Sequence, residues 1–280
     1  MPPRVSVVVP SYNNRNFIEA TMDSILAQTY TDFELIVADH SSTDDTWDKL
    51  QRYSADPRVT LLQTEAGGGA PRNWTRVTRE ARGQLLKLVC GDDLIYPTCL
   101  EEQVSVMDAD ASVGLVACRR DLIDARGDII IRGRGLAGLK GRVPGRLAAR
   151  AAVVAGANIF GEPACVLMRR ELHEKLGGWD NSHPYIIDEA SYVNILLKTD
   201  FYALDRSLAG FRLSAGQWSV NLAREQSTQV IGFHQELAAR APALLSRTDL
   251  VRGNTRARAM AYTRRLAYIW VGRRMHVADS

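Results

Sequence analysis

Strand-like apolar runs alternate with helical segments over the first 110 residues of the chain. The strand-like runs are residues 4–10, 33–39, 59–63 and 85–90. Continuous runs of Val, Ile and Leu are typical of strands that are buried on both faces of a parallel sheet. Between them, apolar residues recur at helical spacing, as Ile18, Met22 and Ile25 do. This alternation predicts an α/β fold with an open, mostly parallel, Rossmann-like sheet and helices on both faces.

Polar side chains stand where three of these runs end. Ser11 and Tyr12 follow the first, Asp39 ends the second, and Asp92 and Asp93 follow the fourth. Ligands of open parallel sheets bind beyond the carboxyl ends of the strands, so we expect these groups to share a site. Two adjacent carboxylates repel each other unless a cation or a set of donors lies between them.

The pattern changes after about residue 110. Residues 113–118 predict a further strand, and residues 126–150, which are rich in Gly and Arg, are interpreted as a long loop. An apolar helix is expected over about residues 191–197. The last sixty residues have a helical pattern and predict a C-terminal helical appendage.

Basic residues gather near the C-terminus. The net charge is only +3, but ten Arg stand against four acidic residues after residue 220. A solvated helix face is our preferred interpretation, and peripheral contact with an acidic membrane or a partner is the alternative. The nearest approach to a membrane span, residues 148–160, is interrupted by Arg150. The first residues lack signal-peptide features, so we expect a cytoplasmic protein, at most peripheral to the inner membrane face.

Two common nucleotide-binding motifs are missing from the sequence. No G-x-G-x-x-G follows the first strand, and no G-x-x-x-x-G-K-[ST] occurs. Their absence argues against a dinucleotide-dependent enzyme and a P-loop NTPase. We expect no nucleic-acid partner, and a homodimer is left open.

Six segments resemble, in their order, the motifs of family 2 glycosyltransferases. They are "VSVVVPSYNN", "QTYTDFELIVADHSSTDDT", "GGGAPRNW", "GQLLKLVCGDDLIYP", "GEPACVLMRR" and "LGGWDNSHPYIIDE", and they span about residues 4–190. The resemblance implies the A-type glycosyltransferase fold and an inverting transfer from a nucleotide sugar. It also implies a nucleotide-sugar-binding half over residues 1–110 and an acceptor-binding half over 111–220. Residues 221–280 then form a helical extension.

The resemblance assigns the nucleotide to the first strand ends. Pro10, Ser11 and Tyr12 would contact the base and ribose, and Asp39 would bind the edge of uracil or thymine. Arg72 would lie close to the base or the phosphates. A turn-forming role for Asp39 and a solvated position at a helix start for Arg72 are the alternatives.

The adjacent pair in "VCGDD" corresponds to the metal motif of the family. The resemblance implies that Asp92 contacts the ribose and that Asp93 binds Mn²⁺ or Mg²⁺, hard ions that take oxygen ligands and leave sites for a diphosphate. Cys90 stands where many relatives carry a first acid. A role in capping the following helix is the alternative for the pair.

The general base of the family follows a "GG(F/W)D" turn, which places it at Asp188, with Glu189 as the competing candidate. Acids favoured by the dipole at a helix N-terminus are the alternative. Glu162 would line the pocket for the acceptor, and Trp179 would lie near the donor sugar or be a core aromatic. Ser214 occupies the position of a histidine that often assists the metal or diphosphate.

These assignments predict an inverting, metal-dependent glycosyltransferase that uses a UDP- or dTDP-sugar and an acceptor hydroxyl. Cell-envelope polysaccharide synthesis and natural-product glycosylation are both open. One alternative is a sugar-1-phosphate nucleotidyltransferase. Such an enzyme is expected to carry a glycine-rich basic stretch after the first strand, which the segment "PSYNNRNF" of this chain lacks. The other is a nucleotide-sugar-binding protein without catalytic activity.

Overall fold

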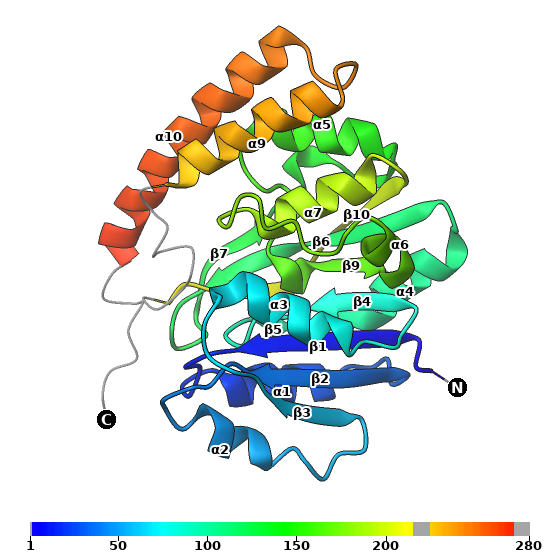
Figure 1. Cartoon of the computed structure of the whole chain (residues 1–280), viewed down its shortest axis with the longest axis vertical. Helices are drawn as coiled ribbons and strands as arrows, with labels where there is room; N and C mark the ends of the chain where they lie inside the picture. Colours follow the sequence, from blue (N-terminus) through cyan, green and yellow to red (C-terminus); the bar gives the residue numbers. More distant parts are fainter. Residues whose placement is uncertain (1, 215–224, 272–280) are drawn as a thin grey trace.

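A computed structural model describes residues 2–214 and 225–271 of the chain. Its strands are β1 (Val5–Ser11), β2 (Phe33–Asp39), β3 (Val59–Gln63), β4 (Leu85–Leu88), β5 (Leu94–Ile95), β6 (Val113–Ile123), β7 (Ile129–Arg134), β8 (Gly141–Val143), β9 (Val166–Arg169) and β10 (Asp200–Arg212). Its α-helices are α1 (Ile18–Leu26), α2 (Thr46–Gln51), α3 (Gly69–Arg79), α4 (Cys99–Ala109), α5 (Gly145–Ala155), α6 (Arg170–Lys175), α7 (Ile187–Leu196), α9 (Gln226–Arg240) and α10 (Arg247–Val271). All of these strands join one sheet (Figure 1).

The first part of the sheet is parallel, as the sequence predicts. The strand order starts β3-β2-β1-β4, and every pairing within this group is parallel. Each residue of β1, β2 and β4 is buried, which explains why these strands are continuous apolar runs. Ser11 of β1 pairs with Asp39 of β2, so the polar groups that end the two strands lie at the same edge.

The rest of the sheet is mixed, so the expectation of a mostly parallel sheet is wrong beyond β4. The order continues β9-β6-β10-β5, and β9 is antiparallel to both of its neighbours. Only the pairing of β6 with β10 is parallel there. The antiparallel strand β9 comes late in the chain and inserts between β4 and β6, a long-range pairing that local patterns do not show.

The interpretation of residues 126–150 as a long loop is also wrong. They contain β7, which forms a hairpin with β6, the short strand β8 beside β10, a 3₁₀ turn (η1, Leu136–Gly138) and the start of α5. Gly127, with φ of 92°, turns the chain between β6 and β7, a conformation that favours glycine. The many glycines therefore mark turns between short elements.

The described C-terminal helices form the predicted appendage. Figure 1 shows α10 beside α5 and α9, at the end of the molecule away from β3. The close contact between α5 and α10 requires Gly253, because a Cβ there would lie 2.2 Å from the carbonyl oxygen of Val153. Arg150 fixes the same interface through an ion pair of 2.8 Å with Asp249.

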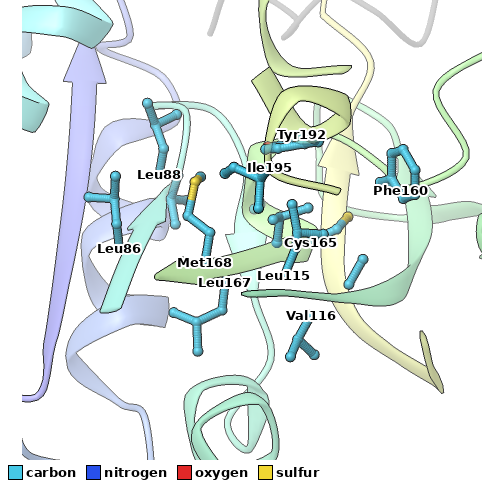
Figure 2. Close-up of a cluster of buried hydrophobic side chains, with 14 of the residues drawn as sticks. Leu86, Leu88, Leu115, Val116, Phe160, Cys165, Leu167, Met168, Tyr192 and Ile195 are labelled. Carbon is cyan, nitrogen blue, oxygen red and sulfur yellow. The ribbon is translucent and has the colours of Figure 1, made fainter. Parts of the chain in front are cut away.

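The core lies between the sheet and the helices that cover it. Figure 2 shows part of it, where side chains of β4, β6 and β9 meet α7. The labelled residues of this cluster are Leu86, Leu88, Leu115, Val116, Phe160, Cys165, Leu167, Met168, Tyr192 and Ile195. Within the two described ranges, no helix has the length and apolar character needed to cross a membrane.

Candidate functional site

One cavity of about 1,410 Å³ opens at the carboxyl ends of β1, β2 and β4. Its walls come from the loops after these strands, from the segment between α5 and β9, and from the start of α7. The predicted site residues on its walls are Pro10, Ser11, Tyr12, Asp92, Asp93, Glu162, Asp188 and Glu189. The structure thus brings most of the predicted site together.

The turn after β1 is built for close packing against the acidic pair. The backbone N–H of Tyr12 donates a 2.9 Å hydrogen bond to Oδ1 of Asn14. A Cβ at Gly91 would lie 2.6 Å from the same oxygen, so only glycine fits before Asp92 without a shift. Tyr12 is 55% exposed and packs edge-on against His40, with ring centroids 6.2 Å apart.

Asp39 does not line the cavity, although it lies beside it. Its carboxylate accepts hydrogen bonds from the backbone N–H of Ser42, at 3.1 Å, and from the hydroxyl of the same residue. The neighbouring His40 lines the wall instead. These contacts match the turn-forming role that the sequence left as the alternative for Asp39.

Arg72 does not line the cavity either. Its guanidinium donates to the carbonyl oxygen of Ala66 at 3.3 Å and lies 3.4 Å from Oε2 of Glu65. The side chain covers the loop that leads into α3, which begins at Gly69, and 41% of it is exposed. This position is the solvated one that the sequence left open for Arg72.

The carboxylates of Asp92 and Asp93 accept hydrogen bonds from residues at the C-terminal end of β10 and just after it. Oδ1 of Asp93 accepts a 3.0 Å hydrogen bond from the backbone N–H of Arg212, and Oδ2 of Asp92 accepts one of 3.4 Å from Ser214. The guanidinium of Arg212 donates to the carbonyl oxygens of Asp92, Asp124 and Ala125. Arg212 is thus a scaffold for the pair, because its guanidinium is buried in these contacts.

The acidic pair has the character of a divalent-cation site. Asp93 is 1% exposed, and its Oδ2 has no hydrogen-bond partner among the residues that the structure describes. Burial and the charge of Asp92 raise the pKa of Asp93 well above its usual range. The charged form of this carboxylate is thus disfavoured unless a cation lies beside it. No cluster of three or more His, Cys, Asp or Glu suited to a metal occurs in the described ranges. Two carboxylates fit an ion that completes its shell with water and phosphate oxygens, as Mg²⁺ does.

Asp188 and Glu189 both lie in the first turn of α7, which begins before the predicted residue 191. Both residues line the cavity, so its lining alone does not separate the predicted base from its competitor. Burial raises the pKa of Asp188 to about 7. Burial and the charge of Asp188 raise the pKa of Glu189 to about 8.

The two acids differ in their hydrogen bonds. Oδ2 of Asp188 accepts a 2.7 Å hydrogen bond from the side-chain amide of Asn158. Both carboxyl oxygens of Glu189 are buried and have no hydrogen-bond partner within the described ranges. Hydrogen bonds to a carboxylate favour its charged form, so Asp188 is the acid better prepared to be ionised.

Glu162 reaches the cavity from the turn before β9. Its carboxylate forms an ion pair with Arg120 of β6, whose Nη2 donates to Oε1 at 3.1 Å. Arg120 is 9% exposed and also lines the cavity. The ion pair fixes the Glu162 carboxylate on the wall that also carries Asp188.

Trp179 lies in the core behind the cavity rather than on its wall. Its indole N–H donates to the hydroxyl of Thr78 at 2.9 Å, and its ring packs edge-on against Trp74 at 5.1 Å. Trp74 itself lines the cavity. Trp179 is therefore a core aromatic that supports the wall.

Several residues on the cavity wall escaped the sequence prediction. They are His40, Trp74, Arg120, Asn158, Tyr185 and Arg264. His40 and Trp74 lie inside the quoted motifs, so their positions next to predicted site residues could have indicated a place on the cavity wall. Arg120, Asn158 and Arg264 lie outside every motif, and only tertiary packing brings them to the site.

Curated relatives share part of the chain. The *Escherichia coli* protein named UDP-Glc:alpha-D-GlcNAc-diphosphoundecaprenol beta-1,3-glucosyltransferase WfgD is 37% identical over 103 residues, which are 37% of this chain and 40% of that protein. An uncharacterised protein of *Mycobacterium tuberculosis* is 32% identical over 206 residues, 70% of this chain and 63% of that one. The chain thus spans less than two thirds of the length of these relatives.

Solved structures share the fold. *Staphylococcus aureus* TarS 1–349, in complex with UDP-GlcNAc, is 20% identical with a TM-score of 0.66, over 84% of this chain and 66% of that one. The mannosyltransferase PcManGT of *Pyrobaculum calidifontis*, in complex with GDP-Man and Mn²⁺, is 22% identical with a TM-score of 0.66, over 100% and 77%. These likenesses confirm the predicted A-type glycosyltransferase fold.

The family comparison covers most of the cavity. The model of the family described as "Glycosyl transferase family 2" matches residues 6–177. This match includes the turn after β1, the acidic pair and the Arg120–Glu162 ion pair. The chain belongs to glycosyl transferase family 2.

Proposed function

We propose that the protein is an inverting glycosyltransferase that moves a sugar from a UDP- or dTDP-sugar to an acceptor hydroxyl in cell-envelope polysaccharide synthesis. The observation that carries this proposal is the single cavity shared by the acidic pair after β4 and by Asp188 of α7. At one end, the acidic pair offers carboxylates to a metal ion, which would in turn hold the diphosphate. At the other end, Asp188 offers a carboxylate with a pKa of about 7 as a base.

The donor nucleotide is assigned to the end of the cavity formed by β1 and the acidic pair. Pro10, Ser11 and Tyr12 line this end and would contact the base and ribose. Asp92, which also lines it, would contact the ribose. Asp39 would support this end of the cavity through the turn that it forms with Ser42.

Asp93 is the residue that we assign to Mn²⁺ or Mg²⁺, because its buried Oδ2 lacks a partner among the described residues. Such an ion, when bound, offsets the negative charge on the leaving diphosphate. The hydrogen bond from Arg212 to Oδ1 leaves Oδ2 of Asp93 for this role.

Asp188 is assigned as the general base. In the proposed step, the acceptor oxygen forms a bond to the anomeric carbon while its proton moves to Asp188. The bond from that carbon to the diphosphate breaks, and the diphosphate keeps the electron pair. Attack on the face opposite the leaving group inverts the anomeric centre. A pKa near the working pH is the best compromise for a base of this kind, and the Asn158 amide orients the carboxylate.

The names of the relatives support an envelope role. The *E. coli* relative is named as a glucosyltransferase that uses UDP-Glc and a diphosphoundecaprenol-linked sugar. The *Bacillus subtilis* relative TuaG is named for teichuronic acid biosynthesis and is 37% identical over 106 residues. Neither name points to natural-product glycosylation, so we favour the envelope role.

Nucleotide release tests the proposal directly. The full chain is incubated with UDP- and dTDP-sugars and Mn²⁺ or Mg²⁺, and slow release of UDP or dTDP by hydrolysis is followed. We expect release with at least one donor and its loss in Asp188→Asn. A nucleotidyltransferase would instead form pyrophosphate from a nucleoside triphosphate and a sugar 1-phosphate. A binding protein would retain the nucleotide sugar unchanged.

A further inference from the structure

Arg264 reaches the cavity from α10, far beyond the residues that the family model matches. It is half-buried and lines the cavity together with Tyr185 and Glu189. The helix that carries it is held against α5 by the Arg150–Asp249 ion pair. The C-terminal helices therefore place a cation in the same cavity as the proposed base.

The hydrogen-bond partners of Arg264 are neutral. Its Nη1 donates to the hydroxyl of Tyr185 and, at 3.5 Å, to Oε1 of Gln226. The guanidinium carbon lies 5.7 Å from the centroid of the Tyr185 ring. In the part of the chain that the structure describes, no carboxylate forms an ion pair with Arg264.

The nearby acid does not neutralise this cation at neutral pH. Glu189 interacts with Arg264 electrostatically, but burial and the charge of Asp188 raise the pKa of Glu189 to about 8. Glu189 is thus mostly protonated at pH 7. Arg264 consequently presents a positive charge to the cavity without a compensating carboxylate.

The partners of Arg264 differ from those of the acidic pair that we assign to the diphosphate. Arg264 donates hydrogen bonds to Tyr185 and Gln226, and it interacts electrostatically with Glu189 of the base segment. The acidic pair that we assign to the donor is instead in contact with Arg212 and Ser214. An anion held by Arg264 would enter on the side of Asp188, from which the acceptor approaches.

We propose that Arg264 binds a phosphate-class anionic group of the acceptor, and this inference rests on the proposed function. A guanidinium offers paired N–H donors that match phosphate oxygens. With the anion held beside α7, the acceptor hydroxyl would be directed towards Asp188. The C-terminal helices would then select acceptors that carry this group.

Calorimetry with octyl diphosphate, a small phosphate-class probe, tests the proposal on the full chain. The titration is done with Mg²⁺, once without UDP and once with saturating UDP, so that an anion in the donor site is distinguished from one at Arg264. We expect binding to persist with UDP. Arg264→Gln should weaken this binding by about tenfold or more, which corresponds to the free energy of hydrogen bonds to a charged group. Arg264→Lys keeps the positive charge and should keep much of the binding.

Arg258→Gln is the matched control, because Arg258 is exposed on the same helix and does not line the cavity. It should bind the probe as the wild type does. Loss of probe binding when UDP is present, or equal binding by Arg264→Gln and the wild type, would overturn the proposal.

UDP binding is measured on the same variants. Intact UDP binding without an Arg264 effect refutes only this inference, whereas failure of the wild type to bind either UDP or dTDP refutes the proposed function. Thermal melting shows whether Arg264→Gln keeps the fold.

Discussion

The side-chain amide of Asn158 donates a 2.7 Å hydrogen bond to Oδ2 of Asp188. The same amide donates to the carbonyl oxygen of Gly161 at 3.0 Å, which fixes its orientation. Asn158 lies between α5 and β9, whereas Asp188 lies in the first turn of α7, so the contact ties two separate segments together at the cavity. The hydrogen bond favours the ionised carboxylate, while burial raises the pKa of Asp188 to about 7.

Asn158→Ala should shift the acid limb of the rate profile. Activity needs ionised Asp188, so turnover falls as the pH drops below about 7. Without the amide, the pKa of Asp188 rises, and we expect the limb to move up by about one pH unit. The measurement is kcat against pH. Asn194→Ala, which removes a hydrogen bond to Asp180 from the same helix, is the control. An equal loss of rate at every pH, with no shift, would assign Asn158 a purely structural role.

Asp93→Ala should abolish metal-dependent binding of UDP. Asp93 carries the buried oxygen that lacks a partner among the described residues, so its removal takes away the assigned ligand. Calorimetry of UDP with and without Mn²⁺ measures the effect, and circular dichroism checks the fold. Asp48→Ala, at an exposed position of α2, is the control. Metal dependence that survives in Asp93→Ala would remove the assignment.

Asp39→Ala should lower stability without changing base preference, because the carboxylate is engaged by Ser42. Loss of these hydrogen bonds in a buried turn costs about 1–3 kcal/mol of unfolding free energy, measured by urea denaturation. A contact with uracil or thymine would show differently. In that case the wild type would prefer UDP over GDP by a few kcal/mol, and the variant would lose the preference.

Glu189→Gln should be more stable than the wild type at high pH. The pKa of Glu189 is about 8 in the folded protein, above its ordinary value of 4.5, so the folded state keeps a proton that the unfolded state releases. The stabilising effect of that proton is complete below pH 4.5 and is lost as the pH rises towards 8. We expect a difference on the order of 2–4 kcal/mol at pH 9. Urea unfolding at pH 5, 7 and 9 measures it. Glu80→Gln, at an exposed position, should show no such trend, and a flat difference for Glu189→Gln would contradict the burial argument.

The sequence predicts the first half of the fold well because its signals are local. Strands such as β1 and β2 are buried along their whole length, so their apolar runs are unbroken. The strand β10 was missed because its residues alternate irregularly between buried and exposed, with register shifts around Ser207. The antiparallel insertion of β9 between β4 and β6 pairs residues that lie far apart in the sequence, so no local pattern predicts it.

The candidate site follows the same division. Asp92, Asp93 and Asp188 were found because they lie in or next to recognisable motifs, and the structure places all three on one cavity. The contacts that set the charge and orientation of these three acids could not be predicted from the sequence. Asn158 and Arg264 approach the site only through the packing of α5, α7 and α10, and no local pattern records that packing.

The rates of Asp188→Asn and Glu189→Gln test the central assignment most directly. Asparagine keeps the size and hydrogen bonding of Asp188 but cannot take the proton. Under single-turnover conditions at pH 7.5, we predict that Asp188→Asn slows sugar transfer by about 10²–10⁴-fold, with UDP affinity nearly unchanged, and that Glu189→Gln keeps most of the rate. A slow Glu189→Gln beside a fast Asp188→Asn would contradict the account and assign the base to Glu189.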